Sequence, residues 1–150
     1  MSEYQTPRFS LPLLAVGQAH KELFHNEALL LLDFLIDSVV LDVSDDPASL
    51  SPAEGDYWLI GPVATAEWSG KSDEIAGWSN GGWHYIKPQE SMKIIMSNNQ
   101  GMAIYHDASW QFIVQVNGPA GGTIIDSEAR SAIDSILDAL RTARILPHIN

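Results

Sequence analysis

Aromatic side chains beside amides and carboxylates are the residues of this sequence whose types and spacing could form a binding site. All five tryptophans lie between residues 58 and 110. The flat apolar face of a sugar ring stacks on such rings, and its hydroxyl groups bind nearby amides or carboxylates. We therefore predict five candidate ligand-binding residues: Trp78, Trp83, Tyr85, Tyr105 and Trp110. The alternative is that the rings form the core of a small sheet, because aromatic residues dominate small β cores.

A sequence repeat positions these rings. Residues 75–86, IAGWSNGGWHYI, align without gaps on residues 102–113, MAIYHDASWQFI, so that Trp83 matches Trp110. Each copy has two strand-like runs separated by four polar or small residues, which is the pattern of a β-hairpin. A repeated hairpin that presents aromatic rings favours a binding or display module over an enzyme.

The acids and histidines show no spacing that specifies catalysis or metal binding. Neighbouring acids such as Glu54 and Asp56 do not establish the facing pair that a glycosidase needs. His20 and His25 are five residues apart, which places them on different faces of a helix. The chain contains no cysteine and no nucleophile elbow, phosphate-binding loop or dinucleotide motif. We therefore expect no enzyme activity, no metal site and no cofactor.

The composition favours an acidic globular protein. The formal net charge is −11, and the eight basic residues are scattered, so we expect no nucleic-acid partner and no anionic membrane surface. The densest apolar stretch, residues 28–32, ends at Asp33 and is far too short to span a bilayer. The first residues lack the pattern of a signal peptide. The apolar fraction of 45% is enough for a hydrophobic core.

The elements that must position the aromatic residues form a single α+β domain over residues 1–150. We predict an extended segment plus a helix over 1–45, a β module over 51–117 and an amphipathic helix over 121–146. The first helix is expected at 18–40, and residues 42–56 are expected to form a turn-rich linker. The β module is predicted to be a small antiparallel meander with strands at 57–60, 75–78, 83–87, 93–96, 102–105 and 110–116.

Both predicted helices carry an apolar face that needs cover. The first has a wide face around Leu30 and Phe34 and a narrower polar face. In the last helix Asp126 is the expected N-cap, and apolar residues follow at spacings of four, three, four and three from Ala129 to Ala143. This helix packs on the sheet or associates with copies of itself. For the second case we predict an oligomer, and a trimer is favoured because isoleucine occupies the seam. The residues predicted to form its interface are Leu30, Phe34, Ile133, Ile136 and Leu140.

Short motifs near the N-terminus resemble the opening signature of DUF2793, a family of uncharacterised proteins. They are PLL at 12–14, GQA at 17–19 and NEAL at 26–29, and the similarity continues nearly to residue 141. The physical roles that we expect for these motifs are structural. Gly17 permits a tight entry into the helix, and Gln18 or Asn26 satisfies backbone groups of the preceding segment or of a partner chain.

The resemblance implies a role in a phage-like particle. Members are similar to proteins of bacteriophages, prophages and gene-transfer-agent clusters of alphaproteobacteria, where they are associated with tail fibres or spikes. The resemblance therefore implies a virion structural protein, made in the bacterial host cytoplasm, that takes part in assembly or host adsorption. The partners would be copies of itself, other virion proteins and cell-surface polysaccharide. The alternative function is a carbohydrate-binding or polysaccharide-degrading module.

Overall fold

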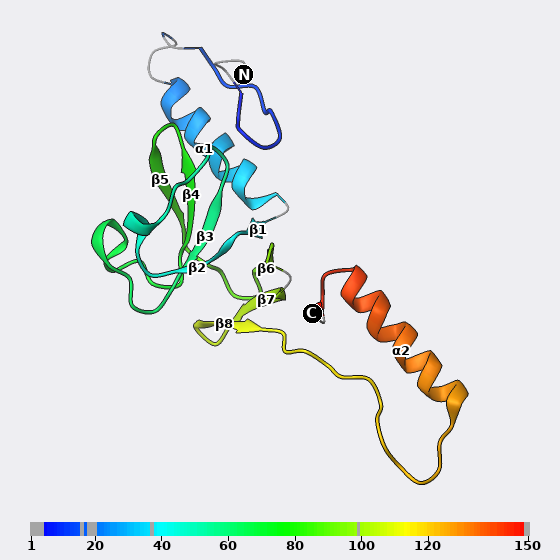
Figure 1. The fold of residues 1–150 in the computed structure, drawn as a ribbon. Coiled ribbons are helices and arrows are strands. Elements are labelled where there is room, and N and C mark those ends of the chain that lie inside the picture. The colour runs from blue at the N-terminus through cyan, green and yellow to red at the C-terminus, as the bar shows by residue number, and fades with distance from the viewer. Residues whose placement is uncertain (1–4, 16, 18–20, 37, 99, 149–150) are drawn as a thin grey trace. The chain divides into compact units, whose positions relative to one another are not determined.

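The computed structural model describes residues 5–15, 17, 21–36, 38–98 and 100–148 (Figure 1). The chain forms two compact units, residues 1–88 and residues 89–150. The described residues contain two α-helices and eight strands, most of them antiparallel, which confirms the predicted α+β class. The assignment of residues 1–150 to a single domain stays a prediction.

The first unit is built on a four-stranded sheet with the order β2-β3-β4-β5. β2 runs parallel to β3, and the other neighbours are antiparallel. A two-residue strand, β1 (Val39–Val40), precedes β2. The bounds of the four sheet strands are Asp42–Ser44 for β2, Tyr57–Ile60 for β3, Ile75–Ser79 for β4 and Gly82–Ile86 for β5.

Helix α1 (Lys21–Leu35) covers one face of this sheet. The ring of Phe34 meets the ring of Tyr57 edge to face, with centroids 4.8 Å apart. A Cβ atom on Gly77 would lie 2.7 Å from the Phe34 ring, so the strand can approach the helix this closely only at a glycine. Leu30 and Phe34 are thus part of the core of this unit.

The opposite face of the sheet is covered by two short 3-10 turns, η1 (Pro47–Ser49) and η2 (Ala66–Trp68). A core cluster lies between these turns and the sheet, formed by Trp58, Ile60 and Ala76 of the strands and by Trp68 of η2. Trp83 packs against this cluster, with its ring centroid 5.6 Å from that of Trp58 and 5.0 Å from that of Trp68. The aromatic residues therefore supply much of the core on this face, as expected for a small sheet.

The second unit contains an antiparallel meander followed by a helix. β6 (Lys93–Met96), β7 (Gly101–His106) and β8 (Ser109–Phe112) pair in chain order. The chain then continues without helix or strand to α2 (Ser127–Thr142). The Asp126 side chain accepts a hydrogen bond of 2.9 Å from the amide of Ala129, which confirms the predicted N-cap.

Helix α2 contacts the rest of its unit along one side of the helix. Leu137 is buried, and Arg141 donates a hydrogen bond of 2.8 Å to the carbonyl of Val116. Arg130 donates another to the carbonyl of Gly121. Long basic side chains, together with one leucine, therefore hold the helix against the segment that leads into it.

The sequence predicted most elements, but several predicted boundaries differ from those of the structure. The last strand was predicted to continue to residue 116, whereas β8 ends at Phe112, and the last helix, predicted over 121–146, spans Ser127–Thr142. All six predicted strands exist, with 57–60 and 93–96 matching to the residue. The prediction that the first helix continues to residue 40 is wrong, because α1 ends at Leu35 and the two valines that follow form β1. The predicted linker at 42–56 contains β2 and η1. The expected role of Gln18 lies outside the described residues.

Candidate functional site

The repeat builds two equivalent pairs of aromatic rings. Trp78 and Trp83 are partners across the β4–β5 hairpin, with centroids 4.9 Å apart and planes at 70°. Tyr105 and Trp110 are partners across β7–β8, at 5.3 Å and 64°. The predicted hairpins and their alignment are therefore confirmed, and each copy holds two rings edge to face.

The first pair lines a hollow of about 320 Å³ in unit 1, here called the Trp78–Trp83 hollow. The hairpin supplies the two rings, and the 3-10 turns with their flanking loops supply the other walls. The residues contributed by those loops are Pro47, Ala48, Leu50, Pro52, Ala66 and Glu67. Its volume is within the range of small-molecule sites, and mostly apolar walls with few polar groups are typical of them.

Glu67 is the one charged side chain among the described residues that line this hollow. It is exposed, and its charge also reaches the neighbouring Tyr85. Burial, and then the charges of Glu67 and Glu74, raise the pKa of Tyr85 to about 12. The Tyr85 ring makes a cation–π contact with Lys71, whose Nζ lies 4.0 Å from the ring centroid. Tyr85 therefore contacts Lys71 and is not a lining residue of the hollow.

The remaining predicted ligand residues lie in the second unit. Trp110 is 8% exposed, and Tyr105 is half-buried beside it. Neither lines the Trp78–Trp83 hollow, so the structure divides the five predicted residues between two hairpins. The hollow also offers a single carboxylate, whereas hydrolysis of a glycosidic bond requires two that face each other. Its geometry suits binding.

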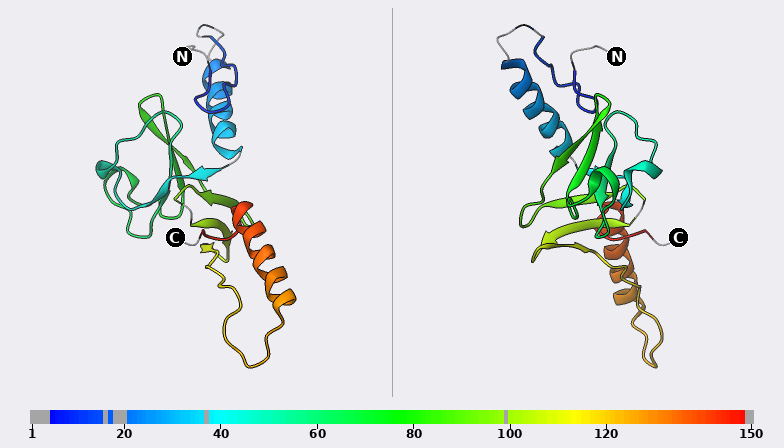
Figure 2. Two further views of the ribbon diagram at one scale, coloured as in Figure 1. Left: turned by 45° about the vertical axis from the view of Figure 1, so that its right-hand side comes forward. Right: turned by 90° about the vertical axis from the view of Figure 1, so that its left-hand side faces the viewer.

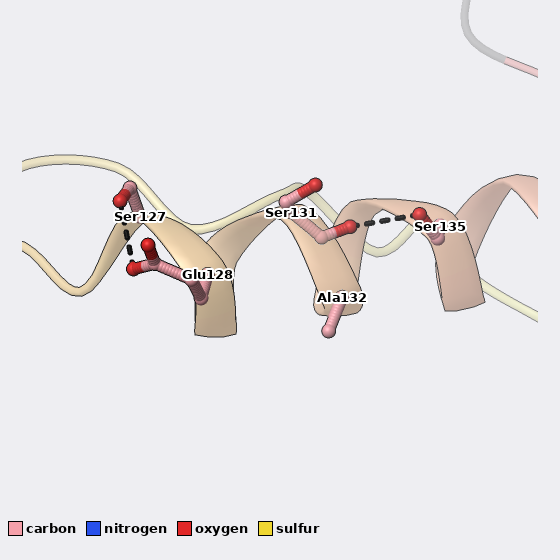
Figure 3. A pocket seen from close by; sticks show the side chains of 5 residues that line it. All are labelled: Ser127, Glu128, Ser131, Ala132 and Ser135. Atoms are coloured by element: carbon pink, nitrogen blue, oxygen red, sulfur yellow. Dashed lines mark hydrogen bonds between the residues drawn. The ribbon is translucent and has the colours of Figure 1, made fainter.

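A second hollow of about 530 Å³ lies along the first turns of α2 (Figure 3). Ser127 donates a hydrogen bond of 2.9 Å to Glu128, which lowers the pKa of that carboxyl group. Ser135 donates one of 2.8 Å to the carbonyl of Ser131. These polar groups are thus bonded within the helix and do not converge on a common point. Among the described residues, no three acids or histidines are grouped to hold a metal ion.

The apolar faces of the two helices form another candidate surface. The exposed fraction is 44% for Ile133 and 59% for Ile136, while Leu140 is half-buried. On α1 the exposed residues differ from the predicted ones, because Leu30 and Phe34 are covered by the sheet. The large apolar side chains that α1 exposes are Leu23, Phe24, Leu32 and Leu35, with Phe24 at 78%. No helix in the described part of the chain is long and apolar enough to cross a membrane.

The polar face of α1 is directed into the protein, which sequence reasoning missed. Asp33 is fully buried and accepts hydrogen bonds from the Thr6 hydroxyl at 2.6 Å and from the amides of Arg8 and Phe9 at 2.9 Å. These bonds hold the N-terminal segment along α1 (Figure 2), and we call this arrangement the Asp33 clasp. The signal in the sequence was a carboxylate inside the apolar run LLLLDFL.

Two further contacts complete this attachment. The Asn26 amide accepts from the amide of Leu14 at 2.8 Å and donates to its carbonyl at 3.0 Å. The expectation that Asn26 satisfies the preceding segment is therefore confirmed, and it joins the PLL and NEAL motifs. The Tyr57 hydroxyl donates to the carbonyl of Asp33 at 3.2 Å, and burial raises its pKa to about 12, so it remains a donor.

Comparison with known protein families finds a match between this chain and one family model. A family model described as "Protein of unknown function (DUF2793)" matches residues 25–111, more than half of the chain. The matched range contains the Asp33 side of the clasp and every residue of the Trp78–Trp83 hollow. Among curated proteins there is no match.

Proposed function

The chain belongs to the DUF2793 family, and on that premise we propose that it is a non-enzymatic structural protein that self-associates through its helices. Its place would be a phage-like virion, as a component of a tail fibre, spike or adaptor, where it would contribute to assembly or host adsorption. The observation that carries the proposal is the apolar seam of α2, which its own unit leaves exposed.

The seam has the composition of a helix-helix interface. Ile133, Ile136 and Leu140 follow one another at spacings of three and four, with alanine at both ends of the row. The helix attaches to its own unit through Leu137 and its arginines, so the seam itself is left for another chain. An apolar row of this kind is unusual on the surface of a protein that remains a monomer.

The charges on α2 permit copies to meet at this seam. The chain carries a net charge of −11, so copies repel one another over most of their surface. On α2, however, Asp134 and Asp138 lie on the side opposite the seam, as the helical period requires. One flank of the seam carries Glu128 in the first turn and then alanines 132 and 139, so beyond the first turn this flank carries no acid. Isoleucine in the seam favours three strands, and we propose a trimer.

Two double variants test this proposal. We expect Ile133→Asp/Ile136→Asp to convert the assembly into monomers, because it would bury carboxylates in the interface. The matched control, Ser131→Asp/Ser135→Asp, adds the same charge to the opposite side and should leave the mass unchanged. Light scattering after size exclusion gives the mass, and circular dichroism checks the fold. An unchanged mass of the isoleucine variant would show that the seam is not the interface.

A second candidate function, a carbohydrate-binding module, is supported by the Trp78–Trp83 hollow. Its lining combines aromatic rings with a carboxylate, the groups that contact the apolar face and the hydroxyl groups of a sugar. The two functions are compatible, because a fibre component that assembles through helices can present a glycan site on its β module. The test is a glycan titration monitored at the two indoles, with loss of binding expected for Trp78→Ala.

A further inference from the structure

We propose that the Trp78–Trp83 hollow selects a ligand that carries an ammonium group, such as an amino-substituted or choline-substituted sugar. This inference rests on the carbohydrate-binding candidate function and specifies its ligand. Three features support it: the angle between the rings, the single carboxylate in the lining, and the rigid support behind the rings.

The rings form a corner and not a platform. The planes of Trp78 and Trp83 meet at 70° with centroids 4.9 Å apart, and both rings line the hollow. A flat sugar ring can stack on one of two such surfaces but cannot lie on both. A compact ammonium group can contact two crossed rings at once, and tryptophan is the most favourable ring for a cation. Crossed aromatic rings are also how proteins bind quaternary ammonium groups.

The charge in the hollow has the sign that a cation requires. Glu67 is the one charged residue among the described lining residues, and it lines the same hollow as the two rings. The chain as a whole carries a net charge of −11, which attracts cationic ligands and repels anionic glycans. Lys71 does not line the hollow, and its Nζ lies on the Tyr85 ring instead. Unit 1 thus already holds one ammonium group on an aromatic face near Glu67.

The corner is held in place before any ligand arrives. Trp78 and Trp83 are fixed as partners on adjacent strands, and Trp83 packs edge to face on the buried Trp58 and Trp68. Little side-chain entropy remains to be lost when a ligand enters such a site, which favours binding of a small group.

The test follows the indole N–H resonances of the ¹⁵N-labelled full chain during titration with three probes. The probes are tetramethylammonium, glucosamine at mildly acidic pH, where its amine is protonated, and neutral N-acetylglucosamine. We expect the first two to shift the Trp78 and Trp83 signals and N-acetylglucosamine to shift them much less. The signals of Trp58, Trp68 and Trp110, which are buried, serve as internal references.

Two substitutions then test the role of the carboxylate. Glu67→Gln keeps the shape of the side chain and should weaken binding of both cations about two- to fivefold, the effect of removing one exposed charge. Glu27→Gln, an equal change at an exposed position of α1 that does not line the hollow, should leave binding unchanged. Trp78→Ala should abolish the response, and unchanged reference indoles would show that this variant is folded.

Each outcome has a definite meaning. Equal shifts with N-acetylglucosamine would overturn the ammonium selectivity while leaving the carbohydrate-binding function in place. Cation binding that is unaffected by Glu67→Gln would overturn the role of the carboxylate and with it the proposed selectivity. If no probe moves the two indoles, the hollow is not a site for either class of ligand, and both proposals fail.

Discussion

Replacement of Asp33 should release the N-terminal segment from α1. The carboxylate is fully buried and receives three hydrogen bonds, from the hydroxyl of Thr6 and from two backbone amides, those of Arg8 and Phe9. Asp33→Ala removes all three acceptor contacts at once. Asp33→Asn keeps one oxygen but places an NH₂ group where the second oxygen meets a donor, so at least one contact becomes repulsive.

The expected cost follows from these contacts. A buried donor that loses its partner costs about 1–3 kcal/mol, and water can reach the partly buried amides of Arg8 and Phe9, which places them at the lower end. The free energy of unfolding of unit 1 should therefore fall by about 3–5 kcal/mol in Asp33→Ala and by about 1–3 kcal/mol in Asp33→Asn. Such losses are large compared with the roughly 5–15 kcal/mol that stabilises a typical protein.

Hydrogen exchange and urea unfolding measure the two consequences. We expect the amides of Arg8 and Phe9 to exchange much faster in both variants, and the unfolding midpoint to fall in the order wild type, Asp33→Asn, Asp33→Ala. Glu27→Gln, an exposed change on the same helix, should stay within about 0.5 kcal/mol of wild type. If Asp33→Ala also stays within this range and leaves the two amides protected, the clasp does not hold the segment.

Two further predictions concern the hairpin turns and the exposed histidine. Ala108→Gly should raise the free energy of unfolding by about 0.5–1 kcal/mol, because Ala108 has φ = 58°, a conformation that glycine adopts without strain. Gly81→Ala at the matching turn should lower it by a similar amount, because φ is 73° there. Thermal unfolding in which both variants shift the midpoint in the same direction would contradict this reasoning. The hydrogen bond to Glu90 raises the pKa of His106 above 6.5, so the pair stabilises the folded state below pH 6.5 and this stabilisation is lost as pH rises through the raised pKa. Glu90→Gln should bring the pKa of His106 back toward 6.5 in an NMR titration, and an unchanged value would exclude the pair as its cause.

Local patterns were sufficient to predict both hairpins and six of the eight strands in the described part of the chain. The Asn80–Gly81 dipeptide between alternating aromatic residues is a strong signal of a two-residue turn, and both of its residues have positive φ. The aligned Asp107–Ala108 turn also has two residues with positive φ although alanine disfavours this conformation, so the two copies of the repeat share the geometry of the turn. The seam of α2 and its N-cap at Asp126 followed from helical spacing and capping preference.

Long-range contacts decided what the sequence could not. No partner was predicted for Asp33 on the polar face of α1, yet Asp33 binds the N-terminal segment, and these partners lie 24 to 27 residues earlier in the chain. β2 was missed because its residues Asp42 and Ser44 favour turns, and only its parallel pairing with β3 makes it a strand. The Trp78–Trp83 hollow depends on Glu67 and on the η1 loop, which come from other parts of the chain.

The solution mass of the purified chain, measured by light scattering over a range of concentrations, tests self-association most directly. A discrete particle of three times the 16.4 kDa chain mass is the predicted result, since a trimer would cover the seam that α2 leaves exposed. A monomer at all concentrations would contradict it, because Ile133 and Ile136 would then remain in contact with water and the helices would not be assembly elements.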